Sequence, residues 1–192
     1  FVVLTGPTAS GKDTVLSKIH ADNPNSLRII TTTSRDMRPN ESEGHPYYFI
    51  SREEFERRIA NHEFFEWVEF RGQLYGTQKK TLEESLSSGR DVFWKIEAKG
   101  VKNIKDKLKH MTNRAILIYL TASDTNTLEA RVKKDEDGKP TNRWSASLAT
   151  WEMEQYDDCD YLIVNDDGKL EESVKKIENI IESKRLEIIR EA

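Results

Sequence analysis

Short, continuous apolar runs recur along the chain, and each is bounded by polar or turn-forming residues. Runs of this length predict strands that are buried on both faces of a sheet. They lie at residues 1–4, 27–31, 91–97, 115–120 and 161–164. The first run ends in Thr5-Gly6-Pro7, which indicates a strand that breaks into a loop.

Helical spacing of apolar residues separates most of these runs. Val15, Leu16 and Ile19 lie on one face of a helix predicted over residues 11–20. Further helical patterns occur at residues 82–86, 101–108, 128–132 and 170–181. Buried strands that alternate with helices predict an α/β fold of three layers, in which helices cover both faces of a five-stranded parallel sheet.

Two regions interrupt this alternation. Residues 32–77 are polar and rich in turn formers before they carry two aromatic runs, which predicts a small β-rich lobe with one helix near residues 52–60. Residues 133–143 are almost entirely charged or polar. Because such a segment cannot bury a core, we expect it to form a mobile flap.

Composition fits one compact domain with small inserted lobes. Of the 192 residues, 33% are charged and 36% are apolar, and the formal net charge is −4. This balance argues against the broad basic surface of a duplex-binding protein, so no nucleic-acid partner is expected. The longest apolar run is too short to span a bilayer, and no secretory pattern is visible. We therefore expect a cytoplasmic protein without a membrane partner.

Cysteine and histidine give no sign of a metal cluster. Cys159 is the only cysteine of the chain, so an intramolecular disulfide is excluded. The four histidines are scattered without the spacing that zinc sites require.

A glycine-bearing loop follows the first predicted strand and precedes the first predicted helix. Its sequence is Gly6-Pro7-Thr8-Ala9-Ser10-Gly11-Lys12, which fits the first seven positions of the Walker A phosphate loop. Glycines let backbone N–H groups converge on phosphate oxygens, and the helix N-terminus adds partial positive charge. Lys12 would then reach the β and γ phosphates of ATP. The alternative is a glycine turn with a solvated lysine.

The position after the loop lysine departs from this motif. The motif expects a serine or threonine that places a hydroxyl on Mg²⁺, whereas this chain has Asp13, with Thr14 one residue later. A carboxylate can also bind Mg²⁺, but it brings negative charge close to the triphosphate. Residues 6–14 are therefore predicted to bind ATP, with Asp13 as a candidate Mg²⁺ ligand.

The sequence resembles guanylate kinases over nearly its whole length. Five segments in family order carry the resemblance: the phosphate loop, Thr31-Thr32-Thr33-Ser34-Arg35-Asp36-Met37-Arg38-Pro39, Gly44-His45-Pro46-Tyr47-Tyr48-Phe49, Phe64-Phe65-Glu66-Trp67 with Gly72-Gln73-Leu74-Tyr75-Gly76-Thr77, and Tyr161-Leu162-Ile163-Val164-Asn165-Asp166. The resemblance implies a P-loop kinase that uses ATP and Mg²⁺ to phosphorylate GMP and dGMP. It also implies a core of residues 1–30, 80–125 and 152–192, a GMP-binding lobe of residues 31–79 and a mobile lid of residues 126–151.

The resemblance implies an acceptor-phosphate site. Arg35 and Arg38 would grip the phosphate, for which guanidinium groups are well shaped. Tyr47 and Tyr75 would add phenolic donors. The alternatives are a solvated pair of arginines and core tyrosines with hydroxyls at the surface.

A guanine site is implied beside it. Glu66 and Glu97 would accept hydrogen bonds from the guanine N1–H and the exocyclic amine, while Thr31 and Thr77 would donate to O6. Adenine has no N1–H, so AMP would leave the carboxylates unpaired. Glu66 lies between two aromatic residues of a predicted strand, so it could instead belong to the solvent-facing side of a sheet.

On the donor side, the resemblance assigns Asn165 to ATP binding and lid arginines to the transferring phosphoryl group. Arg131 fits one lid position, whereas the later arginine is displaced and Arg143 is the candidate for it. Lys12, Arg35, Arg131 and Arg143 are therefore the predicted catalytic residues.

Two departures from the family pattern concern charge. The family usually has Asp-x-Asp where this chain has Lys95-Ile96-Glu97, and a glutamine where it has Lys99. We hypothesise that Asp13 and Lys95 are a compensating exchange and lie in contact. The alternative is two unrelated substitutions in a catalytically weakened protein.

Two other functions remain open at this point. One is a catalytically weak guanylate-kinase-like binding module, and the other is a kinase of the same fold that acts on another small phosphorylated acceptor. The sequence leaves the oligomeric state undetermined.

Overall fold

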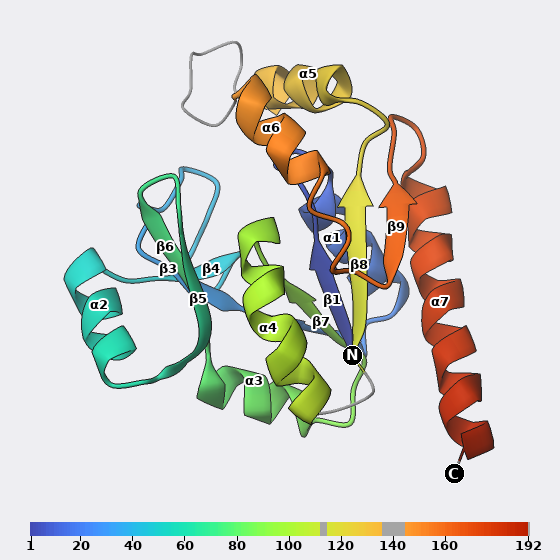
Figure 1. Ribbon diagram of the computed structural model, residues 1–192, viewed down its shortest axis with the longest axis horizontal. Coiled ribbons are helices and arrows are strands. Elements are labelled where there is room, and N and C mark those ends of the chain that lie inside the picture. Colours follow the sequence, from blue (N-terminus) through green and yellow to red (C-terminus); the bar gives the residue numbers. More distant parts are fainter. Residues whose placement is uncertain (112–114, 136–144, 192) are drawn as a thin grey trace.

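A parallel five-stranded sheet forms the centre of the molecule (Figure 1). The computed structural model describes residues 1–111, 115–135 and 145–191. The strands lie in the order β2-β7-β1-β8-β9, and every neighbouring pair runs parallel. Their bounds are Val2–Thr5 for β1, Leu27–Ile29 for β2, Val92–Lys95 for β7, Ile116–Thr121 for β8 and Tyr161–Val164 for β9. The predicted parallel sheet is confirmed.

Helices cover both faces of this sheet (Figure 1). Helices α1 (Lys12–Asp22) and α7 (Leu170–Glu191) pack on one face, and α3 (Lys79–Leu86) and α4 (Ala98–Met111) pack on the other. Side chains of β1 alternate between the two layers, because Val2 joins the α1 and α7 cluster while Val3 joins the α3 and α4 cluster. The three-layer prediction is therefore correct.

The α7 layer gives a test of packing. Ile177 is fully buried against the sheet, whereas Ile189 near the end of the same helix is 71% exposed. We expect Ile177→Ala to lower the free energy of unfolding by about 2–5 kcal/mol, because it leaves a cavity in the core. Ile189→Ala should change it by less than about 0.5 kcal/mol. Urea unfolding measures both values, and equal losses would contradict the packing.

The sheet's edge differs from the prediction. β9 pairs with β8 alone in the five-strand order, and Leu162 and Val164 are 50% and 39% exposed. Ile163 is buried in the cluster that includes α7 residues. A continuous apolar run therefore does not guarantee burial on both faces when the strand lies at an edge.

A second sheet forms the lobe that lies beside the core (Figure 1). Its mixed strand order is β4-β3-β6-β5, with bounds Thr31–Thr33 for β3, Tyr47–Phe49 for β4, Phe64–Phe70 for β5 and Gln73–Gln78 for β6. The strand predicted over residues 27–31 ends earlier than expected. The chain leaves the parallel sheet after Ile29, and Thr31 pairs with Tyr47 in the second sheet. No local breaker marks this change of partner.

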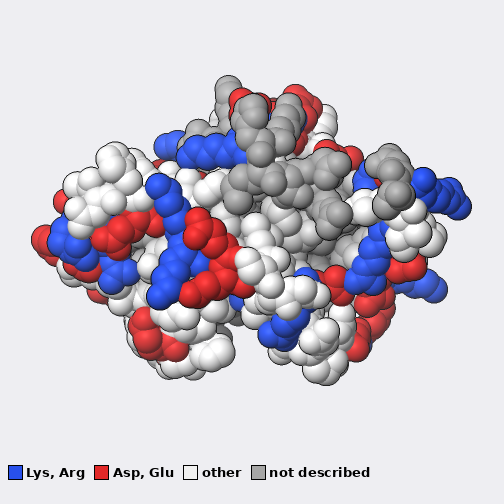
Figure 2. All heavy atoms as spheres, turned by 90° about the horizontal axis from the view of Figure 1, so that it is seen from below, with Lys and Arg blue, Asp and Glu red and all other residues white. Residues whose placement is uncertain are grey.

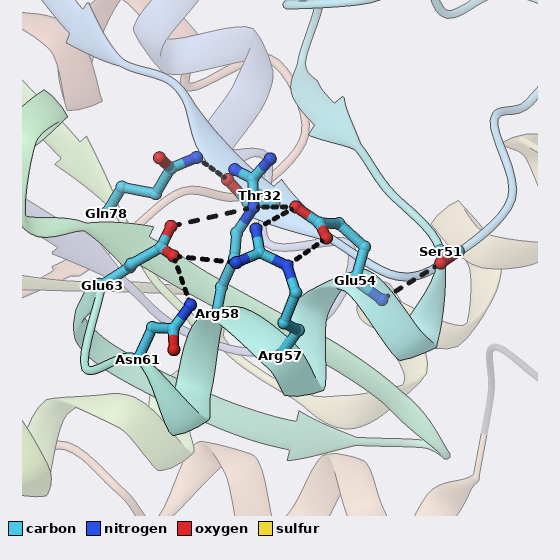
Figure 3. A network of polar contacts seen from close by, with 8 residues as sticks. All are labelled: Thr32, Ser51, Glu54, Arg57, Arg58, Asn61, Glu63 and Gln78. Atoms are coloured by element: carbon cyan, nitrogen blue, oxygen red, sulfur yellow. Dashed lines mark hydrogen bonds and ion pairs between the residues drawn. The ribbon is translucent and has the colours of Figure 1, made fainter.

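Helix α2 (Arg52–Ala60) packs on the lobe sheet and confirms the helix predicted there. Ser51 caps it by accepting a hydrogen bond from the backbone N–H of Glu54 at 3.1 Å. Phe55 is fully buried and forms a cluster with aromatic and apolar residues of β5 and β6. Figure 3 shows polar contacts of this helix, in which Arg57 and Arg58 both donate to Glu54.

Helices α5 (Thr125–Asp135) and α6 (Ala146–Met153) contact each other above the sheet (Figure 1). The predicted flap begins inside α5, because residues 133–135 are helical. Its residues 136–143 lie outside the described part of the chain. The apolar pattern of the sequence does not predict α6.

Charges of both signs are intermixed on the surface shown in Figure 2, including the lobe that carries α2. Lysine and arginine side chains there lie next to glutamate and aspartate. In the described part of the chain, no helix combines the length and the apolar character needed to cross a membrane.

Candidate active site

The phosphate loop connects β1 to α1 and needs glycine at two positions. Gly6 has φ 139°, and a Cβ there would lie 1.9 Å from the Leu120 carbonyl oxygen. Gly11 has φ 91°, and its Cβ would lie 2.5 Å from the Asn165 amide nitrogen. Both positions therefore combine left-handed backbone with close approach of another strand end, so no other residue fits without a shift.

Lys12 is held by the loop itself. Its side chain is 8% exposed, and Nζ donates to the carbonyl oxygens of Gly6 and Pro7, each at 2.8 Å. Burial lowers the pKa of Lys12, while the nearby carboxylate of Glu97 opposes this effect. The alternative of a solvated lysine is wrong, because the ammonium group is enclosed within the loop.

A cavity of about 460 Å³ lies at the outer side of the loop. Asn165 fixes this wall, since its side chain donates to the Ser10 carbonyl at 2.9 Å and accepts from the Ser173 hydroxyl at 3.1 Å. The cavity brings together many of the residues predicted to bind ATP. Its lining includes Ala9, Gly11, Lys12, Asp13, Thr14, Arg131 and Asn165.

Arg131 extends from α5 to this cavity. Its guanidinium donates to the Asn165 carbonyl at 2.7 Å and to the Ala9 carbonyl at 3.3 Å, and it pairs with Asp167. Its predicted role at the phosphates stays a prediction. Arg143, the second predicted lid arginine, lies outside the described residues.

A second cavity of about 170 Å³ lies between the loop and the lobe, and we call it the chamber. Its lining consists of Thr8, Ala9, Lys12, Asp13, Arg35, Arg38, Glu41, Tyr47, Phe70, Arg71, Tyr75 and Glu97. Lys12 and Asp13 line both this chamber and the 460 Å³ cavity. The loop lysine therefore stands where the two spaces adjoin.

Arg35 is oriented by a partner that sequence reasoning missed. Glu41 accepts hydrogen bonds from both terminal nitrogens of Arg35, at 2.7 and 2.8 Å, and another from the backbone N–H of Arg38 at 2.9 Å. The Arg35 and Glu41 side chains are each 12% exposed, which excludes a solvated pair at Arg35. Glu41 lies six residues from Arg35 in an irregular loop, so no periodic pattern connects the two residues.

The two tyrosines meet at the chamber wall. The rings of Tyr47 and Tyr75 pack edge to face, with centroids 5.8 Å apart. Tyr47 is 8% exposed and its hydroxyl contacts the Lys95 ammonium at 3.0 Å. A hydroxyl at the surface is therefore excluded for Tyr47.

Glu66 faces the interior of the lobe. It is 5% exposed, whereas its neighbour Trp67 is 43% exposed, so the solvent-facing interpretation is wrong. The Thr77 hydroxyl donates to Glu66 at 2.8 Å and accepts a hydrogen bond from the Trp94 indole at 2.8 Å. Thr77 thus orients Glu66, and donation to a guanine O6 would require breaking this bond. Trp94, a strand residue without a motif, was not predicted.

A small cavity of about 10 Å³ lies beside Glu66 and is also lined by Thr31, Glu97, Tyr47 and Tyr75. Three of these residues, Tyr47, Tyr75 and Glu97, also line the chamber. The space is too small for a purine, so the residues that line it would have to rearrange before a base could enter. Burial raises the pKa of Glu66 to about 7, although the hydrogen bond from Thr77 opposes the shift.

Comparison with known proteins decides the family, because a family model described as guanylate kinase matches residues 1–184. The chain belongs to the guanylate kinase family. It is 36% identical over 186 residues to the guanylate kinase of Carboxydothermus hydrogenoformans, covering 96% of this chain and 88% of that protein. It is 35% identical over 191 residues to that of Latilactobacillus sakei, covering 98% and 91%. A crystal structure of guanylate kinase from Anaplasma phagocytophilum matches with a TM-score of 0.75 and 28% identity, over 95% of this chain and 84% of that one.

At the two positions that depart from the family pattern, the predicted contact between Asp13 and Lys95 is present. Lys95 Nζ lies 3.0 Å from each carboxylate oxygen of Asp13, well inside the distance for an ion pair. Arg28 is a second partner, 2.5 Å from Oδ1 of the same carboxylate. Desolvation opposes ionisation, but Lys95 and Arg28 hold the pKa of Asp13 well below its usual range.

These contacts bear on the predicted metal role of Asp13. Both of its carboxylate oxygens accept hydrogen bonds from cations, so a metal ion would have to compete with Lys95 and Arg28. Among the residues that the structure describes, no group of three or more potential metal ligands occurs. A metal-binding Asp13 stays a prediction, and the ion pairs oppose it.

Proposed function

We propose that this guanylate kinase transfers the γ-phosphoryl group of ATP to GMP, and also to dGMP. The observation that carries the proposal is a succession of three spaces with shared lining residues, namely the cavity at the phosphate loop, the chamber and the cavity beside Glu66. ATP would occupy the first and the reacting phosphates the second. Guanine would bind at the third after that small cavity has widened. The proposed units are a core of residues 1–30, 80–125 and 152–192, an acceptor lobe of residues 31–79 and a lid of residues 126–151.

Guanine selectivity would come from Glu66. Its ionised carboxylate accepts hydrogen bonds, and guanine presents donors at N1 and at its exocyclic amine. AMP lacks the N1–H, so a buried carboxylate would lose its partner and bind AMP weakly. Glu97, half-buried at the same cavity, would take the second donor, and Thr31 would face O6.

The transfer step needs alignment and positive charge. A phosphate oxygen of GMP attacks the γ-phosphorus of ATP, the new P–O bond forms as the bond to ADP breaks, and GDP and ADP result. Lys12 would neutralise the donor phosphates, and Arg35 and Arg38 would hold the acceptor phosphate. The acceptor oxygen is already ionised near neutral pH, so no general base is required.

Mg²⁺ would enter with ATP. Mg²⁺ usually keeps several waters and is held by substrate phosphates together with one or two carboxylates. Three carboxylates line the chamber with Lys12, namely Asp13, Glu41 and Glu97. Asp13 is already paired with two cations, and Glu41 is paired with Arg35. The residues therefore fit a Mg²⁺ ion carried by phosphates better than a site made by the protein alone. When bound, the ion would neutralise charge on the phosphates.

A nucleotide panel tests the proposal. ADP release is followed with ATP–Mg²⁺ and each of GMP, dGMP, AMP, CMP and UMP as acceptor. We expect turnover with GMP and dGMP and little with AMP. Turnover with a different acceptor would support a kinase of another substrate, and ligand binding without turnover would support a binding module.

The ionisation of Glu66 predicts a pH dependence. Its pKa in the free protein is raised to about 7, so the ionised fraction rises as pH increases through this value. Between about pH 6 and pH 8 that fraction increases about tenfold, and KM for GMP should fall by a similar factor. KM values across this range measure the effect. The Glu66→Gln variant is the control, because it keeps the titration of GMP's own phosphate and lacks that of Glu66.

A further inference from the structure

Lys95 connects the two substrate-binding parts of the molecule. It lies at the end of β7, is 8% exposed, and donates to Asp13 on the loop helix and to Tyr47 on the lobe. Each of these contacts is 3.0 Å long. Asp13 and Tyr47 both line the chamber, so Lys95 contacts residues on both of its walls.

The charge of this group is not balanced. Asp13 supplies one negative charge, while Lys95 and Arg28 supply two positive charges. The three side chains therefore keep one surplus positive charge. The single negative charge of Asp13 does not neutralise both Lys95 and Arg28. That surplus lies next to the hydroxyl of Tyr47, where an anion in the chamber would benefit from it.

The direction of the hydrogen bond fixes the Tyr47 proton. An ammonium group has donors and no acceptor, so the Tyr47 oxygen must accept the bond from Lys95. The hydroxyl proton then points away from Lys95. Because Tyr47 lines the chamber, that proton is available to a phosphate there, and the adjacent cation makes it a stronger donor.

We propose that Lys95 is a positioning residue for the acceptor phosphate, acting by directing the Tyr47 hydroxyl proton into the chamber. This inference rests on the proposed function and deepens it. It assigns a role to a lysine that stands where the family usually has an aspartate. Lys95 acts through Tyr47 and does not itself contact the phosphate.

The first test is Lys95→Met, which removes the charge and shortens the unbranched side chain by one atom. Asp13 retains Arg28 as a partner, so its carboxylate is not left without a cation. We expect KM for GMP to rise about tenfold, the effect of losing one charge-assisted hydrogen bond. KM for ATP should stay within about twofold of wild type. An unchanged KM for GMP would overturn the proposal.

A double-mutant cycle with Tyr47→Phe tests the route of action. If Lys95 acts through the Tyr47 hydroxyl, Lys95→Met in the Tyr47→Phe background should change KM for GMP by less than about twofold. A full tenfold effect in that background would show direct phosphate binding and would overturn the positioning role.

A second cycle with Asp13→Asn separates positioning from charge neutralisation. If Lys95 serves only to neutralise Asp13, removal of both charges should restore KM for GMP. We expect KM for GMP of the double variant to stay about as high as that of Lys95→Met, because Lys95 is still absent and no longer directs the Tyr47 hydroxyl proton into the chamber. Restoration would contradict the proposal. If Lys95→Met does not fold, the Tyr47 cycle is run entirely in the Asp13→Asn background.

Two controls complete the experiment. Lys80→Met removes an 84% exposed lysine on α3 and should leave KM for GMP unchanged. Thermal unfolding establishes that each variant is folded. Wild-type protein that does not phosphorylate GMP would refute the proposed function itself, whereas an active wild type with independent, additive variants would refute only the role of Lys95.

Discussion

Replacing Lys12 by alanine is expected to lower kcat by about 10³-fold, as observed when a preorganised charge is removed from a transition state. The structure gives the reason, because Lys12 is enclosed by the loop and lines both the 460 Å³ cavity and the chamber. Its charge is in place before the substrates bind, and its ammonium group would exchange the carbonyl oxygens of Gly6 and Pro7 for phosphate oxygens. Steady-state turnover with saturating ATP–Mg²⁺ and GMP measures the loss.

The matched control for this prediction is Lys18→Ala on the same helix. Lys18 pairs with Asp22 at the surface, away from the loop, so its removal should leave kcat unchanged. Circular dichroism and thermal unfolding should show that both variants keep the fold. Near-normal turnover of a folded Lys12→Ala protein would refute the role of the phosphate loop.

Glu66→Gln is expected to lower kcat/KM for GMP by about 10²–10³-fold, because a neutral amide replaces the charged carboxylate that would accept a hydrogen bond from guanine. The value for AMP should change far less, so the ratio of the two constants reports selectivity directly. Glu69→Gln is the control on the same strand, since Glu69 is about half exposed and pairs with Arg52.

The stability of Glu66→Gln distinguishes a binding role from a structural one. Burial raises the pKa of Glu66, which means that the folded protein pays a free-energy cost to keep the carboxylate ionised near neutral pH. Glutamine carries no charge and can still accept from Thr77, so the midpoint of thermal unfolding should not fall. Loss of both stability and guanine selectivity would indicate that Glu66 serves the fold, and unchanged selectivity would refute the assignment.

Lys12 and Glu66 illustrate two levels of predictability. The loop around Lys12 follows from local stereochemistry, because the Gly6 and Gly11 positions and the lysine form one contiguous motif between a strand and a helix. The burial of Glu66 does not follow in this way. Strand alternation places it opposite its aromatic neighbours, and it cannot tell which side faces the interior. Packing settled this, with Glu66 inside and Trp67 outside.

The sheet shows the same division. Apolar runs and helical spacing located all five strands of the parallel sheet, because the hydrophobic pattern of consecutive residues reflects how an element is buried. The same patterns did not show that the chain changes sheets after Ile29, that β9 is half exposed at the edge, or that α6 exists. Those outcomes depend on which neighbours the chain meets after it folds.

The sequence by itself determined the fold class, the phosphate loop and the family, since each is specified by residues that are close together or by several motifs in order. Only the tertiary structure decided which polar groups form hydrogen bonds with each other. Glu41 binds Arg35, Trp94 donates to Thr77, and Lys95 donates to both Asp13 and Tyr47. Lys95 is 82 residues from Asp13 and 48 from Tyr47, so no local pattern links all three. Their contact follows from the place where β7 ends, beside the loop helix and the lobe, where the buried ammonium group of Lys95 needs polar partners.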